Sequence, residues 1–205
     1  TTLESEEYNL FKSWQLEIGK KIILFPGRLT PWKGQEMFLE SLNKVNTHLG
    51  HEAFIAVILG SQQGRDLYRK KLIRLVEQYR LTNQVKFIEH CKKMPLAYKI
   101  CHLVVSASIE PEAFGRVSVE AQSMQKPILA SNIGGSNETV INDKTGFLYE
   151  AGNTEEMSKK IIEILNLEEN TLKQMGIEGR KNVINKFNVE KMCFSTYSEY
   201  KKLFN

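Results

Sequence analysis

The sequence predicts an α/β fold in which a parallel sheet is covered by helices on both faces and the chain closes with helices alone. Short, nearly all-apolar runs rich in branched residues are typical of strands buried on both faces, as in KIILFP at 21–26 and AFIAVIL at 53–59. Segments with helical spacing of apolar residues separate such runs, and this alternation specifies a parallel sheet. From about Thr154 onward, only helical patterns remain.

The elements are expected in a regular order along residues 21–150. After the first strand, Met37, Phe38, Leu42 and Val45 repeat with helical spacing, which predicts a helix over 35–45. The remaining elements are, in order, an amphipathic helix over 65–80, the strand VKFI at 85–88, the short helix PLAYKIC at 95–101, the strand HLVVSAS at 102–108, a helix from about 114 to 125, and the strands PILAS at 127–131 and GFLYE at 146–150.

Three helices are predicted at the C-terminal end, one after Asn153, one over 168–186 and one over 189–204. Asn153 and Thr154 are candidate caps for the first, with two glutamates in its first turn. The last carries an apolar stripe, a pattern that usually marks contact with a core. The stripe consists of Val189, Met192, Cys193, Tyr197, Tyr200 and Phe204.

Composition restricts the classes of function. With 205 residues, 41% hydrophobic and 25% charged, the chain is typical of a globular protein with one core or two small ones. No apolar run approaches the roughly 18 to 20 residues of a membrane span, and the first residues lack signal-peptide features, so a cytoplasmic location is expected. Three cysteines fit a reducing compartment. A net charge of +4 is compatible with an anionic small ligand or surface, and far from that of a nucleic-acid binder.

The loop after the first strand is a candidate anion site. Ligands of open parallel sheets bind beyond the carboxyl ends of the strands. The segment PGRLTPWKG places Arg28 and Lys33 there, just before a helix N-terminus whose free amides also favour negative charge. Two cations in this position suit a phosphate or a diphosphate.

The segment EPEAFGRVSVEA at 110–121 sets Glu112 and Glu120 around a Phe-Gly that opens a helix. The amides of the first turn, from Phe114, Gly115, Arg116 and Val117, are donors for an anion. Glu112 precedes the turn, and Glu120 lies about five residues along the helix, roughly 7 to 8 Å away. Carboxylates that flank an anion site suit an elongated ligand with a central diphosphate and hydroxyls at both ends, such as a nucleotide sugar.

The two glutamates allow other interpretations. A metal site needs clustered ligands, whereas the chain has no Asp-x-Asp and no His-x-x-x-His, and its His-Cys pairs match no usual zinc spacing. A two-carboxylate hydrolase is geometrically reasonable but leaves Arg28 and Lys33 without a role. The simplest alternative is a pair of surface glutamates on an amphipathic helix. The basic helix at 65–80 is compatible with anionic lipid, although a solvated face is the favoured explanation.

Four segments, GRLTPWKG, VKFIEH, EAFGRVSVEA and GGSNETVINDKTGFLYE, together resemble a known family in order and spacing. The family is the retaining family 4 (group 1) glycosyltransferases, and the resemblance is to the C-terminal, donor-binding domain of their GT-B fold. It implies a Rossmann-like domain over 21–205, with 1–20 as the remnant of an interdomain connection and the N-terminal acceptor domain absent. Two positions depart: Asn137 replaces a frequent proline, and Glu89 replaces a usual glycine, which leaves the nucleotide base open.

The resemblance implies the nucleotide-diphosphate-sugar binding half of a retaining, metal-independent glycosyltransferase. The whole enzyme would transfer a hexosyl or related group in cell-surface glycan or glycolipid synthesis, such as that of lipopolysaccharide. It would use no cofactor, would pair with the acceptor domain and could contact the inner face of a membrane peripherally; the fragment alone would be inactive. A non-catalytic nucleotide-sugar sensor and a related GT-B epimerase or phosphorylase are the alternatives.

The resemblance also assigns roles to residues. Arg28, Lys33 and Glu112 would be catalytic: the two cations would contact the diphosphate and stabilise charge on the leaving nucleotide, and Glu112 would contact sugar hydroxyls. The other donor-binding residues would be Gly27, Ala113, Phe114, Gly115, Arg116 and Val117 for phosphate and sugar, Glu120 for the ribose, and Phe87, Ile88 and His90 along the base. The closing helix of such proteins often packs against the other domain, so part of the Met192, Tyr197 and Tyr200 stripe is expected to be exposed.

Overall fold

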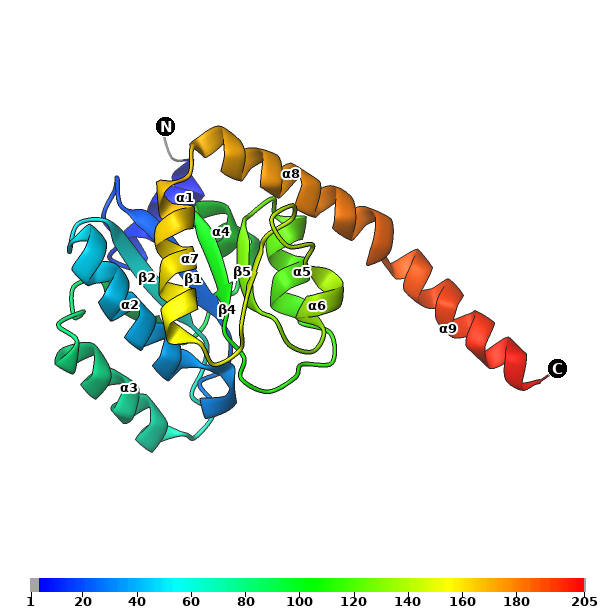
Figure 1. The fold of residues 1–205 in the computed structure, drawn as a ribbon, viewed down its shortest axis with the longest axis horizontal. Coiled ribbons are helices and arrows are strands. Elements are labelled where there is room, and N and C mark those ends of the chain that lie inside the picture. The colour runs from blue at the N-terminus through cyan, green and yellow to red at the C-terminus, as the bar shows by residue number, and fades with distance from the viewer. Residues whose placement is uncertain (1–3, 205) are drawn as a thin grey trace.

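Six parallel strands form one sheet in the order β3-β2-β1-β4-β5-β6 in the computed structural model, which describes residues 4–204 (Figure 1). The strand order reverses between the adjacent strands β1 and β4, and such a switch point is where open sheets bind ligands. The strands are β1 (Lys21–Pro26), β2 (Phe54–Leu59), β3 (Val85–Ile88), β4 (Leu103–Ser106), β5 (Ile128–Ser131) and β6 (Phe147–Tyr149).

Helices cover both faces of the sheet, as expected. The first face packs against α2 (Gln35–Leu49), α3 (Asp66–Gln78) and α7 (Thr154–Asn166), and the second against α1 (Ser5–Ser13), α4 (Met94–Ile100) and α5 (Arg116–Ser123). Successive side chains of a strand point to opposite faces, so β1 sends Ile23 and Phe25 to the first core and Ile22 and Leu24 to the second. Burial on both faces explains why this strand is a continuous apolar run rather than an alternating one.

The predicted strands and helices between residues 21 and 204 are all present, with ends that differ by a few residues. Two elements were missed, α1 and the 3₁₀ helix η1 (Pro31–Lys33), and the short helix α6 (Ser136–Thr139) follows the Gly-Gly turn. The helix α1 packs on the domain, because Phe11 and Trp14 are buried and Lys99 Nζ of α4 lies 2.7 Å from Glu7. The role of residues 1–20 as an interdomain connection stays a prediction, and residues 1–3 lie outside the described part of the chain.

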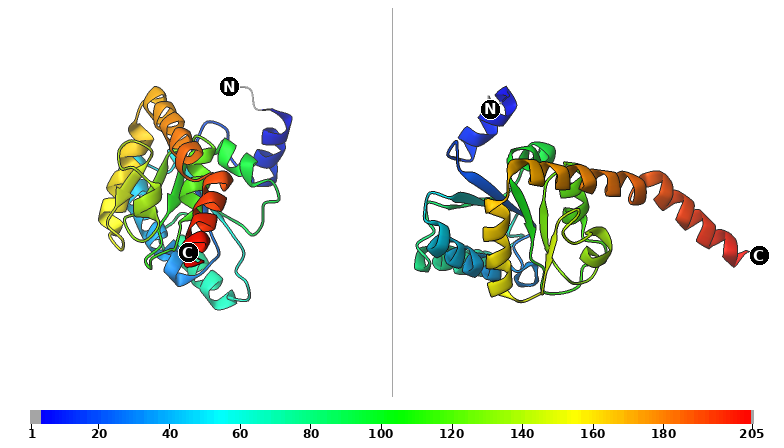
Figure 2. Two further views of the ribbon diagram at one scale, coloured as in Figure 1. Left: turned by 90° about the vertical axis from the view of Figure 1, so that its right-hand side faces the viewer. Right: turned by 45° about the horizontal axis from the view of Figure 1, so that its top comes forward.

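The two last helices differ in their packing. Helix α8 (Glu169–Lys186) packs against α5, whereas α9 (Val189–Leu203) leaves the domain after Phe187 and projects outward (Figures 1 and 2). None of the described residues of α9 is buried, and Met192, Tyr197 and Tyr200 are 61% to 64% exposed. The predicted exposure of this stripe is confirmed, and the expectation of core contact is wrong within this chain. No helix in residues 4–204 combines the length and apolar character needed to cross a bilayer.

Candidate functional site

A cavity of about 470 Å³ opens at the carboxyl end of the sheet, beside the switch point between β1 and β4. Its lining comes from the loops that follow β1 and β2 and from the facing sides of α4 and α5. Arg28, Arg116 and Glu120 supply its charged groups. The apolar part of the lining includes Met94, Pro95, Val117 and Met124. The cavity therefore combines a charged rim with apolar walls, as small-molecule sites usually do.

The Arg28 loop is held from beneath by a buried side chain. Gln35, the first residue of α2, is fully buried and donates through Nε2 to the carbonyl oxygen of Arg28 at 2.8 Å. The Tyr68 hydroxyl of α3 in turn donates to Gln35 Oε1 at 3.2 Å. Because its backbone is tied to the core in this way, the loop holds the exposed residue Arg28 at the edge of the cavity.

Lys33 and Glu112 form an ion pair between the loops that follow β1 and β4. Lys33 Nζ lies 2.7 Å from Glu112 Oε1, and both side chains are mostly shielded from solvent. The Ser108 hydroxyl donates to the same carboxylate oxygen, and Lys33 Nζ lies 4.5 Å from the centroid of the Trp32 ring. Two predicted site residues that are 79 positions apart in sequence thus meet directly.

A glycine allows this meeting. Gly34 has φ +78°, and a Cβ at this position would lie 1.9 Å from the carbonyl oxygen of Ala107, just beyond β4. A side chain here would force the two loops apart. The close approach therefore places Lys33 within reach of Glu112.

The segment before α5 is supported by the Gly-Gly turn. The helix begins at Arg116, and Gly115 is its N-cap, with φ +72°. The amide of Gly135 donates to the carbonyl oxygen of Glu112 at 2.7 Å, and a Cβ on Gly135 would lie 2.5 Å from the backbone of Phe114. The glycines thus let two backbones touch beside the cavity. The Phe114 ring is exposed on one side and packs edge-on against Phe187, with centroids 5.6 Å apart.

Glu120 lies inside the cavity on α5. Its Oε2 accepts from the Tyr98 hydroxyl of α4 at 2.7 Å, and its Oε1 lies 3.3 Å from Arg116 Nη2. Burial raises the pKa of Tyr98, and the hydrogen bond to the carboxylate raises it further, so the phenol stays a protonated donor. The two glutamates have different partners, and within residues 4–204 no three His, Cys, Asp or Glu side chains come together as a metal-ligand group.

The predicted site residues fall into three groups. Gly27, Arg28, Arg116, Val117 and Glu120 surround the cavity. Lys33 and Glu112 form the neighbouring ion pair, and Ala113, Phe114 and Gly115 occupy the loop between Glu112 and α5.

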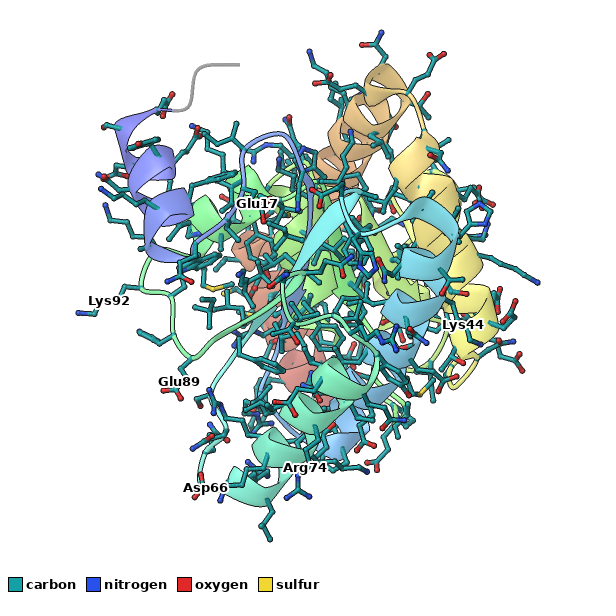
Figure 3. All side chains as sticks on the ribbon, turned by 90° about the vertical axis from the view of Figure 1, so that its left-hand side faces the viewer. Glu17, Lys44, Asp66, Arg74, Glu89 and Lys92 are labelled. Atoms are coloured by element: carbon teal, nitrogen blue, oxygen red, sulfur yellow. The ribbon has the colours of Figure 1, made fainter. Side chains whose placement is uncertain are left out.

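The third group, Phe87, Ile88 and His90, does not line the cavity. Phe87 packs against the core beneath α2 and α3, Ile88 packs against the opposite core, and His90 borders a separate hollow of about 490 Å³ beside α1. Glu89 and Lys92, which flank His90, point away from the domain (Figure 3). Contact of this segment with a base stays a prediction.

Sequence reasoning missed three supporting residues: Gln35, Tyr98 and Ser108. Gln35 gave no signal, because a polar residue in the first turn of a helix is common. Tyr98 gave none, since its apolar neighbours on α4 mark a core residue and its partner lies 22 positions away. Ser108 at the end of a strand gave none either.

Comparison with known proteins identifies the family. The family model described as "Glycosyl transferases group 1" matches residues 7–182. The capsular polysaccharide biosynthesis glycosyltransferase CapM of Staphylococcus aureus is 28% identical over 166 residues, which are 81% of this chain and 42% of CapM.

Two solved structures have the same fold. A glycosyltransferase from Rickettsia africae superposes with a TM-score of 0.92 at 30% identity, over 100% of this chain and 53% of that one. Anabaena Alr3699/HepE, solved in complex with UDP-glucose, gives a TM-score of 0.87 at 26% identity, over 98% of this chain and 54% of that one. The chain spans about half the length of these GT-B transferases. With its Rossmann-like sheet and the family match over most of its length, the chain belongs to the group 1 glycosyl transferases.

Proposed function

We propose that this chain is the donor-binding half of a retaining glycosyltransferase and binds a nucleotide-diphosphate sugar in the cavity between α4 and α5. The observation that carries the proposal is the order of groups along the site. Glu120, Arg28 and the start of α5 line the cavity. The Lys33–Glu112 ion pair lies on the adjoining loops, which follow β1 and β4. Hydroxyl acceptors on either side of cationic groups match a ligand with a central diphosphate.

Each group then has a role in the transfer. Arg28 and Lys33 contact the diphosphate, the amides that begin α5 bind its oxygens, Glu112 accepts from sugar hydroxyls and Glu120 accepts from the ribose. When the bond between the anomeric carbon and the diphosphate oxygen breaks, negative charge grows on the leaving diphosphate. The two cations stabilise that charge where it develops, and this assigns them the task that a divalent ion performs in other transferases.

The relatives support the wider assignment. CapM is described as a capsular polysaccharide biosynthesis enzyme, and HepE was solved with UDP-glucose. We place the whole enzyme in the synthesis of cell-surface glycans or glycolipids, with transfer of a hexosyl or related group. An acceptor-binding domain completes the cleft of such an enzyme, so this chain alone binds the donor but transfers sugar at no useful rate.

The test is calorimetric titration with uridine, guanosine and adenosine diphosphates and their glucose or mannose derivatives, first without metal and then with magnesium. We expect saturable binding of one nucleotide series, with an affinity that magnesium does not raise. If no nucleotide binds in either condition, the proposal for this chain is contradicted. Binding that requires magnesium would contradict the role given to the two cations.

A further inference from the structure

A buried phenol supports the cavity beneath Glu120. Tyr98 is only 2% exposed, and its hydroxyl donates to Glu120 Oε2 at 2.7 Å. The contact joins α4 to α5, and both residues line the same cavity. Among the described residues, Glu120 is the one hydrogen-bond partner of this hydroxyl.

The Glu120 carboxylate keeps acceptor capacity that faces the cavity. An ionised carboxylate offers about four acceptor positions, and the Tyr98 hydroxyl occupies one on Oε2. The Arg116 guanidinium, 3.3 Å from Oε1, is largely exposed, so this second contact is a weak surface ion pair. The Glu120 side chain is 39% exposed, which leaves its remaining lone pairs open to a ligand.

We propose that Tyr98 is a positioning residue for the nucleotide ribose: its hydroxyl fixes the Glu120 carboxylate in the orientation that accepts hydrogen bonds from the ribose hydroxyls. The inference rests on the proposed function, in which Glu120 receives the ribose. A glutamate on a helix surface has several rotamers, and one that is fixed in advance loses less entropy when it binds. Tyr98 therefore contributes to the preference for ribonucleotides over deoxyribonucleotides without touching the ligand.

The phenol is suited to this task because it can only donate to the carboxylate. Its raised pKa keeps it protonated across the working pH range of a protein. Its ring is fixed in the apolar cluster formed by α1, α4 and the second face of the sheet. A water molecule in its place would lack this fixed position.

The experiment compares ribose discrimination in the wild-type chain and in Tyr98→Phe, which removes the hydroxyl and keeps the ring. Calorimetry gives the affinities for the nucleoside diphosphate that the wild type binds and for its 2′-deoxy counterpart, chosen from the uridine, guanosine and adenosine pairs. We expect the wild type to prefer the ribonucleotide. In Tyr98→Phe the ratio of the two affinities should fall about three- to tenfold, the usual range for one hydrogen bond. The deoxynucleotide, which keeps only its 3′-hydroxyl for Glu120, should lose less affinity than the ribonucleotide.

Tyr149→Phe is the matched control. Tyr149 is 1% exposed, and within residues 4–204 its hydroxyl has no hydrogen-bond partner, so the same chemical change is made at a similarly buried ring. The ratio of ribonucleotide to deoxynucleotide affinity in Tyr149→Phe should equal that of the wild type. Because Tyr98 acts through Glu120, the double variant Tyr98→Phe/Glu120→Ala should show the same ratio as Glu120→Ala alone.

The outcomes separate this inference from the proposed function. An unchanged ratio in Tyr98→Phe, or an equal loss of affinity for both nucleotides, overturns the positioning role alone. If the wild type binds no nucleoside diphosphate, the proposed function fails and the inference fails with it. If the wild type binds both forms equally, the ribose role of Glu120 and the positioning role of Tyr98 both fall, while diphosphate binding stands.

Discussion

At the scale of single residues, the Lys33 ammonium is the most enclosed cation of the site. It contacts the Glu112 carboxylate and the Trp32 ring, and little of it reaches solvent. A diphosphate that binds here shares this ammonium with Glu112. Under the proposed function, the pair would link the diphosphate that leaves to the sugar that is transferred.

Replacement of this lysine tests the diphosphate contact. Lys33→Ala removes a charged hydrogen bond of about 1.5 to 3 kcal/mol and leaves the Glu112 carboxylate without its cation, so nucleoside diphosphate affinity should fall roughly ten- to a hundredfold. Titration calorimetry measures the change.

Lys44→Ala is the control for Lys33→Ala. Lys44 of α2 (Figure 3) lies 2.9 Å from Glu155 of α7 and does not line the cavity. It is also an ion-paired lysine, but we expect its loss to leave the affinity unchanged. Equal affinities for the Lys33→Ala and wild-type chains would remove Lys33 from the site.

We expect a histidine at the opposite end of the sheet to make the free energy of unfolding depend on pH. His102 Nδ1 accepts from the Ile22 amide at 3.0 Å, although part of the ring faces solvent. Desolvation, with smaller effects from Lys21 and Lys126, lowers the pKa of His102 from 6.5 to about 4. Between these values the unfolded chain binds the proton and the folded chain does not. The free energy of unfolding should therefore fall as pH drops from about 6.5 to about 4.

Thermal unfolding from pH 7 to pH 4 checks this dependence. Many carboxylates titrate near the lower limit, so the comparison is with His102→Gln, whose side-chain oxygen can accept from the same amide but does not titrate. Between pH 7 and pH 5, the Tm of the wild type should decrease more than the Tm of the variant. Parallel curves for the two proteins would show that His102 takes no part in the loss.

At the scale of elements, the close packing of short loops determines the positions of the site residues. Gly34→Ala adds strain at φ +78° and a clash with the carbonyl oxygen of Ala107, so it should lower the free energy of unfolding by about 2 kcal/mol or more. It should also weaken nucleotide binding, because the clash moves Lys33. Urea denaturation and calorimetry measure the two effects.

Gly152→Ala separates strain from clash. Gly152 has φ +90°, and nothing lies within 4 Å of a Cβ built there. Its substitution should cost about 1 kcal/mol, from strain alone, and leave binding intact. If the two variants lost equal stability, the clash with Ala107 would contribute nothing to the destabilisation caused by Gly34→Ala.

The sequence predicted the main elements because β1 and β2 are continuous apolar runs, as strands buried on both faces are, and because α2 and α3 show helical periodicity with one buried face. The short elements η1 and α6 are too brief to show a period. Helix α1 was missed because it is mostly polar and buries only a few side chains, among them Phe11. Its capping box with Glu4 and Glu7 is a local signal that could have revealed it.

The strand ends and their polar residues were enough to predict the edge of the sheet at which the candidate cavity lies, since the carboxyl ends of parallel strands share one edge. The contacts within it were not predictable. The Tyr98–Glu120 bond and the Gln35 contact with the Arg28 loop depend on the relative placement of helices, which no periodicity encodes. The Lys33–Glu112 pair depends on how closely two loops approach, which only the packing at Gly34 determines.

At the scale of the whole molecule, α9 is separable from the domain. Removal of residues 188–205 takes away no described residue that is buried, so the Tm should change by less than about 2 °C, and solubility should rise as exposed aromatic side chains are lost. Differential scanning calorimetry measures the Tm. A large fall would show that α9 stabilises the domain.

Asn182→Ala in α8 provides the contrast to that truncation. Asn182 Nδ2 donates to Gln122 Oε1 and to the carbonyl oxygen of Thr139, both at 3.1 Å and buried. This single substitution should cost about 1 to 3 kcal/mol, more than the loss of the whole of α9. The order of the two effects places the end of the cooperative unit between α8 and α9.

The outward course of α9 also determines how the chain moves through a solvent. Its fifteen residues form a rod about 22 Å long at 1.5 Å per residue, attached to a domain whose radius of gyration is about 16 Å for its size. Friction on such a shape exceeds that on a sphere of equal mass, so the monomer should emerge early from a size-exclusion column. Light scattering, which measures mass directly, distinguishes this elongated monomer from a compact dimer.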